Sequence, residues 1–277
     1  SARKVLAEYI GYLFIKTGNT ILKEEKALML YGGGANGKSV FFEIVNALLG
    51  AENVICHSLQ DLTDGSGYYR AQLANKLVNY ASEINGKLES SIFKQLVSGE
   101  PVSARLPYGK PFHLTQYARL IFNCNELPRG NEFTDAYFRR FLIVPFDVTI
   151  PPEEQIKDLH SQIIENELAG VFNWVLRGLA RLLKQNGFTE CIAARRAVED
   201  YRLQSDSLRQ FLNDERYKSD VNVKTKIVDY KYYCQENGFY HLTKPNFIKR
   251  LKSYGIQVAT INVGNVAYLK KHKSDEE

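Results

Sequence analysis

The stretch Ala-Leu-Met-Leu-Tyr-Gly-Gly-Gly-Ala-Asn-Gly-Lys-Ser, residues 27–39, decides the fold of this chain. It opens with an apolar run typical of a buried strand, and residues 32–39 match the phosphate-loop pattern G-x-x-x-x-G-K-[ST] in full. A helical pattern then runs from Lys38 to Leu49, with Gly50 as its C-cap. Glycines let backbone N–H groups turn toward phosphates at the start of such a helix. The stretch therefore predicts a nucleotide-binding α/β domain.

Further apolar runs of strand length follow this loop, at residues 53–57, 76–82, 119–124 and 141–146. Strands that alternate with helices favour a parallel sheet. We therefore expect an α/β P-loop domain with a central, mostly parallel five-stranded sheet. Residues 153–204 read as helical throughout.

The loop motif assigns a chemical role to each part of a nucleotide site. Lys38 would reach the β- and γ-phosphates of ATP, and Ser39 would ligate Mg²⁺. The cofactors expected from the sequence are therefore ATP and Mg²⁺. The motif and the residue after it supply the expected cofactor-binding residues: Gly33, Gly34, Ala35, Asn36, Gly37, Lys38, Ser39 and Val40.

Polar and charged residues stand at the ends of the later apolar runs. Glu83 follows the second run and could activate water for hydrolysis, although a solvated strand-end acid is the alternative. Asn125 follows the third run and could hold that water or the γ-phosphate, or serve the turn before Pro128. Arg139 and Arg140 precede the fourth run, where one of them could reach a neighbouring subunit's nucleotide or join a surface ion pair.

Residues 101–114 read as a hairpin or a projecting loop between two of these runs. Arg105, Tyr108 and Lys110 combine positive charge with an aromatic face there. This combination suits sequence-tolerant contact with single-stranded DNA. A solvated surface loop is the alternative interpretation.

The order of these motifs resembles the superfamily 3 helicases of the AAA+ class over residues 26–150. The motifs are GGGANGKS, YASEI, SGEPVSARLPYGKPF, RLIFNCNELPRG and DAYFRRFLIVPF. More narrowly, they look like the helicase part of the poxvirus and satellite-phage type of primase-helicase. Such proteins occur in phages, plasmids and integrated mobile elements.

This resemblance implies a hexameric ring that hydrolyses ATP between subunits and threads single-stranded DNA through its centre. It implies that Glu83 is the Walker B acid and shares the Mg²⁺ site with Ser39. It also implies that Asn125 is the sensor asparagine. Arg140 is the closest match to the arginine finger, and Arg139 is the next.

The formal net charge of +5 is unevenly distributed along the chain. Residues 1–208 hold 23 basic and 23 acidic side chains, whereas residues 209–273 hold 13 basic and 5 acidic ones. A segment with a net charge of 13 − 5 = +8 is a candidate module for binding a polyanion.

The basic segment reads as helices at residues 206–217 and 224–237, a third helix capped by Thr243, and a β-hairpin at residues 257–270. This is the order of a winged-helix domain that would bind duplex DNA. The expected DNA-binding residues of its third helix are Lys244, Lys249, Arg250 and Lys252. A basic face on a protein-interaction domain is the alternative.

Composition excludes several classes of protein. With 44% hydrophobic and 24% charged residues, the chain is neither disordered, collagen-like nor a coiled coil. It has no run near the ~18 apolar residues that a membrane span needs. Its four cysteines form no CxxC motif or Cys/His cluster, so the sequence predicts free thiols in a reducing cytoplasm.

The expected domains are an N-terminal helix at residues 1–25, the P-loop core at 26–150, a helical segment at 151–205 and a winged-helix domain at 206–277. If the natural protein is a primase-helicase, the resemblance places the primase region upstream and makes the first segment the end of a connecting collar. The expected function is that of an ATP-dependent replicative DNA helicase or replication initiator of a mobile element. An AAA+ ATPase that remodels protein substrates and a P-loop kinase of a small molecule are the alternatives.

Overall fold

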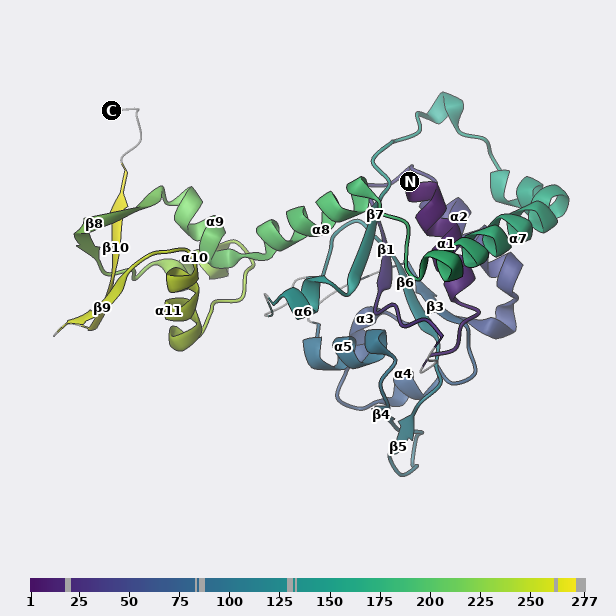
Figure 1. Ribbon diagram of the computed structural model, residues 1–277, viewed down its shortest axis with the longest axis horizontal. Helices are drawn as coiled ribbons and strands as arrows, with labels where there is room; N and C mark the ends of the chain where they lie inside the picture. Colours follow the sequence, from purple (N-terminus) through teal and green to yellow (C-terminus); the bar gives the residue numbers. More distant parts are fainter. Residues whose placement is uncertain are drawn as a thin grey trace. The chain divides into compact units, whose positions relative to one another are not determined.

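The computed structural model describes two compact units of the chain, Ser1–Tyr201 and Arg202–Glu277 (Figure 1). The residues described are 1–17, 21–82, 84, 88–128, 132, 134–261 and 264–272. None of the helices among these residues is long and apolar enough to cross a lipid bilayer.

A five-stranded sheet forms the centre of the first unit, in the order β2-β3-β6-β1-β7. Its strands are β1 (Ala27–Tyr31), β2 (Val54–Ile55), β3 (Val78–Ala81), β6 (Arg119–Cys124) and β7 (Phe141–Pro145). Every neighbouring pair is parallel, so the carboxyl ends of all five strands lie at one edge of the sheet. The predicted α/β fold with a parallel five-stranded sheet is confirmed.

Helices cover both faces of this sheet. The α-helices of the first unit are α1 (Ala2–Tyr12), α2 (Lys38–Leu49), α3 (Leu59–Thr63), α4 (Tyr68–Ala71), α5 (Ser90–Ser98), α6 (Asp135–Phe138) and α7 (Leu159–Gln185), and short 3-10 turns are η1 (Ala51–Asn53) and η2 (Pro152–Glu154). Helix α8 (Ile192–Ser205) runs across the boundary between the two units.

Alternate strand residues supply two hydrophobic cores, as the two-residue period of a strand requires. Leu28 and Leu30 of β1 face a core that includes buried residues of α1, α2 and α7. Met29 of the same strand faces a second core, which includes buried residues of α3, α5 and α6. The first unit is therefore a three-layer α/β/α arrangement (Figure 1).

The expectation of continuous helix over residues 153–204 is wrong. Helix α7 ends at Gln185, and its C-cap Asn186 takes a left-handed backbone with φ of 53°. The chain re-enters helix only at Ile192. Helix α7 packs closely against α1. A Cβ added to Gly178 would lie 2.4 Å from the carbonyl carbon of Ala7, so glycine permits this close packing.

An antiparallel hairpin projects from the first unit, formed by β4 (Val102–Ala104) and β5 (Phe112–Leu114) (Figure 1). Val102 pairs with Leu114, and Ala104 pairs with Phe112. Val102, Ala104 and Leu114 are buried against the core, which fixes the base of the hairpin. The predicted hairpin at residues 101–114 is confirmed.

The second unit combines three helices with an antiparallel sheet in the order β8-β10-β9. Its elements are α9 (Ser207–Asp214), β8 (Tyr217–Thr225), α10 (Tyr230–Glu236), α11 (Lys244–Ser253), β9 (Val258–Ile261) and β10 (Gly264–Lys271). Strand β8 corrects the prediction, which extended a helix back to Lys224. The register of β8 on β10 jumps from Lys224 to Ser219 between adjacent partner residues, so the strand is irregular.

Candidate functional site

The glycine-rich loop between β1 and α2 folds into a tight turn. Gly34, Ala35 and Gly37 have φ values of 122°, 46° and 86°, in the left-handed region that glycine adopts most readily. Gly37 is also the N-cap of α2. Gly32 has no room for a side chain, since a Cβ would lie 2.3 Å from the carbonyl oxygen of Phe146. The loop is thus shaped by its own glycines and by the chain after β7.

The side chain of Lys38 lies across the base of this loop. Its Nζ donates to the carbonyl oxygen of Gly32 at 2.6 Å and to Oδ1 of Asn36 at 3.0 Å. The amide of Asn36 in turn donates to the carbonyl oxygen of Phe146 at 2.9 Å. Burial lowers the pKa of Lys38, because desolvation disfavours the charged amine. An incoming anion that accepts from Nζ would offset that desolvation.

A cleft of about 670 Å³ opens beside the loop. Its walls combine the loop with the carboxyl ends of β3 and β6 and with the segment before α7: Gly34, Ala35, Asn36, Gly37, Lys38, Ser39, Val40, Ser82, Asn123, Asn125, Ile150, Glu154, Gln155, Ile156 and Leu159. The cleft therefore places most of the predicted cofactor-binding residues around one space. The lining also includes four apolar residues, Val40, Ile150, Ile156 and Leu159.

Two asparagines enter the cleft from the end of β6. Asn125, which the sequence singled out, is exposed there, and Asn123 is buried. The Oδ1 of Asn123 accepts a hydrogen bond of 3.0 Å from the hydroxyl of Tyr80, whose ring packs edge-on against Phe42 of α2. Sequence reasoning missed Asn123, although the two-residue period of a strand puts it on the same side as Asn125. Its fixed amide is a strong candidate to contact a bound ligand.

Glu83, the predicted Walker B acid, lies outside the described residues. The residue before it, Ser82, follows β3 directly, is exposed and lines the cleft. Ser39 is exposed in the first turn of α2 and lines the same cleft. Ser39 and Ser82 therefore line one space, which is compatible with the predicted metal site.

The two predicted arginines have opposite surroundings. The guanidinium of Arg140 is buried, and it donates to the Oγ of Ser98 from Nε at 3.2 Å and from Nη2 at 2.9 Å. It also lies 3.6 Å from the carboxylate of Glu25 and donates to the carbonyl oxygen of Ala136. Arg139 is 62% exposed, and among the described residues it forms an ion pair with Glu25 at 3.2 Å.

This difference changes the order of the candidates for a finger. An arginine that reaches a neighbouring subunit must be free to extend, and the contacts of Arg140 hold it inside its own subunit. Although partial burial opposes ionisation of Glu25, the hydrogen bond from Lys23 and the charges of both arginines hold its pKa below the usual range. Glu25 therefore stays ionised between them. The geometry favours Arg139 over Arg140, the reverse of the order implied by the resemblance.

The tip of the β4–β5 hairpin is formed by Tyr108. Its backbone has a φ of 59°, and its side chain is fully exposed. Lys110 is exposed beside it, whereas Arg105 turns back to donate to the carbonyl oxygen of Gly109 at 2.9 Å. Tyr108 and Lys110 are therefore available to a partner, whereas Arg105 stabilises the turn.

On α11 of the second unit, Lys244, Lys249 and Lys252 are exposed, as a nucleic-acid contact requires. Arg250 is not, because it forms a 2.5 Å ion pair with Asp206 and a 3.1 Å hydrogen bond with the hydroxyl of Tyr254. Burial alone would lower the pKa of Arg250, but Asp206 raises it. Arg250 holds the unit together, so its prediction as a DNA contact is not supported by its surroundings.

Comparison with known proteins gives partial matches. A sequence family described as of unknown function, DUF5906, matches residues 30–140. A protein of Acanthamoeba polyphaga mimivirus named "Putative helicase" is 27% identical over 150 residues, which make up 52% of this chain and 16% of that protein. The matched stretch thus spans about a sixth of its curated relative.

The fold is similar to that of the C-terminal region of NrS-1. One apo structure of that region has a TM-score of 0.53 at 12% identity, covering 97% of this chain and 70% of the other. A second has a TM-score of 0.52 at 13% identity, covering 97% and 71%. The chain therefore shares sequence with a helicase-named viral protein and shares its fold with the NrS-1 region.

Proposed function

We propose that this chain is the motor part of a replicative DNA helicase of the AAA+ class, superfamily 3, from a mobile element or virus. In this proposal it hydrolyses ATP as a hexameric ring and moves along single-stranded DNA. The likeness to a mimivirus protein named as a helicase supports the proposal. The order of the sequence motifs supports it independently.

The single observation that carries the proposal is the cleft where the glycine-rich loop meets the polar ends of β3 and β6. Backbone N–H groups of the loop and Lys38 would hold the phosphates of ATP. Ser39 and Glu83 would hold Mg²⁺, which would neutralise charge on the phosphates. Asn123 and Asn125 would orient the attacking water. The apolar residues of the lining would contact the adenine base.

We assign the arginine finger to Arg139. The residue is exposed, and the ion pair with Glu25 that holds it among the described residues is worth only about 0–1 kcal/mol. It can therefore leave Glu25 at little cost when a neighbouring subunit presents a nucleotide. Arg140 would support it by fixing the turn after α6 from inside.

DNA would be contacted at two places. Tyr108 would stack on bases of the single strand, and Lys110 would pair with its phosphates. The second unit would act as a winged-helix domain in which Lys244, Lys249 and Lys252 face the phosphates of duplex DNA. Its three helices and β9–β10 hairpin support this assignment, and β8 extends the hairpin into a three-stranded sheet.

One observation favours a second candidate function, the remodelling of protein substrates. The hairpin exposes Leu106 and Phe112 beside Tyr108, with exposed fractions of 56%, 38% and 104%. These exposed side chains could bind an unfolded polypeptide as well as a nucleic-acid base. The two candidates differ in whether DNA or unfolded protein stimulates the ATPase.

The test is the ATPase rate of the full chain with and without single-stranded DNA, alongside the mass of the oligomer. The helicase proposal expects stimulation by DNA that weakens with salt, and a loss of at least about 100-fold in Lys38→Ala. Lys184→Ala, an exposed lysine at the end of α7, is the matched control and should leave the rate unchanged. Normal turnover in Lys38→Ala would refute the proposal. Stimulation by unfolded protein alone would favour remodelling.

A further inference from the structure

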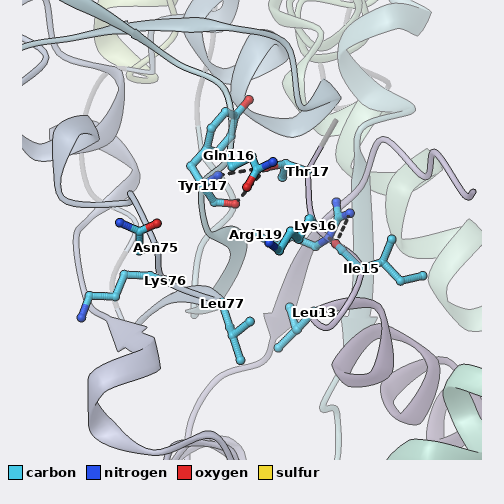
Figure 2. A pocket seen from close by; sticks show the side chains of 10 residues that line it. All are labelled: Leu13, Ile15, Lys16, Thr17, Asn75, Lys76, Leu77, Gln116, Tyr117 and Arg119. Carbon is cyan, nitrogen blue, oxygen red and sulfur yellow. Dashed lines mark hydrogen bonds between the residues drawn. The ribbon is translucent and has the colours of Figure 1, made fainter. Parts of the chain in front are cut away.

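A second pocket lies in the first unit, away from the nucleotide cleft. It has a volume of about 220 Å³ and is lined by residues from three segments, 13–17, 75–77 and 116–119 (Figure 2). The first segment follows α1, the second precedes β3, and the third leads into β6 and includes its first residue. None of the residues in this lining belongs to the glycine-rich loop or to the cleft beside it.

The pocket and the cleft sit at opposite ends of the same two strands. Leu77 comes before β3 and Ser82 after it, while Arg119 opens β6 and Asn123 lies near its end. At about 3.3 Å per residue, these pairs are separated by roughly 13–17 Å. A ligand in one space would therefore leave the other open.

The charged side chains described in the pocket lining are all positive. Lys16, Lys76 and Arg119 all line it, and none of the ten described residues in its lining is acidic. Lys16 is exposed, and the amine of Lys76 donates to the carbonyl oxygen of Glu52 at 2.5 Å, which leaves it further protons to donate. The three cations would together attract an anion to this space.

Arg119 is the buried member of this group, with only 9% of its surface exposed. Its Nε donates to the carbonyl oxygens of Tyr12 and Ile15, each at 3.1 Å, and Nη2 donates to Ile15 at 2.7 Å. The ring of Tyr12 lies 3.5 Å from the guanidinium carbon. No carboxylate of the described residues forms an ion pair with Arg119, so its charge is held by neutral partners.

Arg119 also lines the pocket. Its Nε and Nη2 atoms make the hydrogen bonds to the two backbone carbonyls, and a side-chain hydrogen bond with Tyr12 further supports its charge. The neighbouring wall is already fixed, because Thr17 and Tyr117 exchange hydrogen bonds of 2.9 and 3.2 Å (Figure 2). A buried cation with no acidic partner among the described residues, beside a wall that is already ordered, can bind an anion.

We propose that this pocket binds a phosphate group. The guanidinium of Arg119 and the ammonium groups of Lys16 and Lys76 are donors that suit phosphate oxygens. The volume lies below the ~300 Å³ at which pockets for drug-sized ligands begin, so it suits one phosphate group rather than a whole nucleotide. The phosphate could come from a nucleic-acid backbone or from a free phosphate. The Gln116–Tyr117 wall follows β5 directly, which places the pocket beside the base of the hairpin.

The experiment is a titration of the full chain with inorganic phosphate at constant ionic strength, followed by amide NMR signals. Signals of Leu77 and Tyr117 report on the pocket, and the signal of Gly37 reports on the glycine-rich loop. The test variant is Lys16→Gln with Lys76→Gln, which removes two charges at the rim and leaves the buried arginine in place. Lys184→Gln is the matched control for loss of an exposed lysine outside both spaces.

We expect saturable shifts at the pocket signals and at least about tenfold weaker binding in the double variant, with the control unchanged. Absence of saturable shifts, or equal affinity in the double variant, would overturn the proposal. A repeat with oligothymidylate identifies the source of the phosphate. Shifts at the pocket that inorganic phosphate competes away assign it to a DNA backbone, and binding of inorganic phosphate alone assigns it to a free phosphate. Neither readout depends on ATP hydrolysis, so the proposal can fail while the helicase function stands.

Discussion

Replacement of each neighbouring arginine by alanine should give opposite results, although Arg139 and Arg140 are adjacent in sequence. Arg140→Ala removes a buried guanidinium that holds Ser98 and pairs with Glu25. Arg139→Ala removes a side chain that is 62% exposed. We expect the first change to lower stability and the second to lower the rate of ATP hydrolysis.

The magnitudes follow from the contacts. Breaking a buried, hydrogen-bonded ion pair costs about 3–5 kcal/mol, and 1 kcal/mol shifts Tm by about 2–4 °C in a unit of this size. Arg140→Ala should therefore lower Tm by roughly 6–20 °C. The exposed pair of Arg139 is worth about 0–1 kcal/mol, so Arg139→Ala should change Tm by less than about 4 °C. Loss of an arginine finger costs about 10³–10⁵ in the rate of hydrolysis.

The assay combines differential scanning calorimetry with ATPase rates measured well below the transition temperature. Arg195→Ala is the control, since Arg195 is 69% exposed and pairs with Glu190 at 2.6 Å in the same unit. Mixing Arg139→Ala with Glu83→Gln chains should restore activity, because each mutant would supply what the other lacks at a shared site. The reasoning is refuted if Arg140→Ala keeps its Tm and loses hydrolysis while Arg139→Ala remains active.

Four further changes test other parts of the molecule. Gly32→Ala places a methyl carbon 2.3 Å from a backbone carbonyl oxygen, so we expect at least about tenfold weaker binding of a fluorescent ATP analogue. Tyr108→Ala should reduce affinity for oligothymidylate by about 1–3 kcal/mol while Tyr108→Phe keeps it, as measured by fluorescence anisotropy. Lys249→Gln with Lys252→Gln should weaken duplex binding and flatten its dependence on salt; an unchanged slope would remove these lysines from the interface. Glu8→Gln should cost about 2–4 kcal/mol in urea unfolding, because the buried carboxylate accepts from Arg181 and from the amide of Thr189 at 2.8 Å.

Local patterns were sufficient to predict the centre of the first unit. The apolar runs at Ala27–Tyr31 and Arg119–Cys124 match β1 and β6 residue for residue. Both strands are buried on each side, so their sequences are mostly apolar, as is typical of central strands in a parallel sheet. The glycines after β1 were equally informative, because few other residues tolerate the left-handed backbone of that turn.

Strand β8 could not be predicted by the same reasoning. Its sequence, Tyr217–Thr225, alternates poorly, and most of its side chains are exposed or half-buried. The register jump leaves Asp220–Val223 without partners on β10. These residues therefore have no need to alternate between a buried and an exposed face, and the sequence lacks the two-residue period of a strand. Pairing with a strand more than 40 residues later, rather than local propensity, stabilises this element.

Charged residues were the least predictable part of the candidate site. Arg140 and Arg250 occur in basic clusters that read as exposed, and both are held by acids or hydroxyls from distant elements. Asp206, for example, lies 44 residues before Arg250. A sequence shows how many cations a segment carries, but only the fold shows which of them remain available to a ligand.

The role of Arg119 also could not be predicted from the sequence. In the sequence it is an ordinary cation at the start of an apolar strand, and nothing nearby marks it as a ligand-binding group. The fold shows its role, because Tyr12 and Ile15, more than 100 residues earlier, accept hydrogen bonds from the guanidinium through their carbonyl oxygens. Those carbonyls hold the charge without neutralising it, whereas a carboxylate in their place would have closed the site. The absence of an acid among the described residues around Arg119 is therefore what makes the pocket a candidate for an anion.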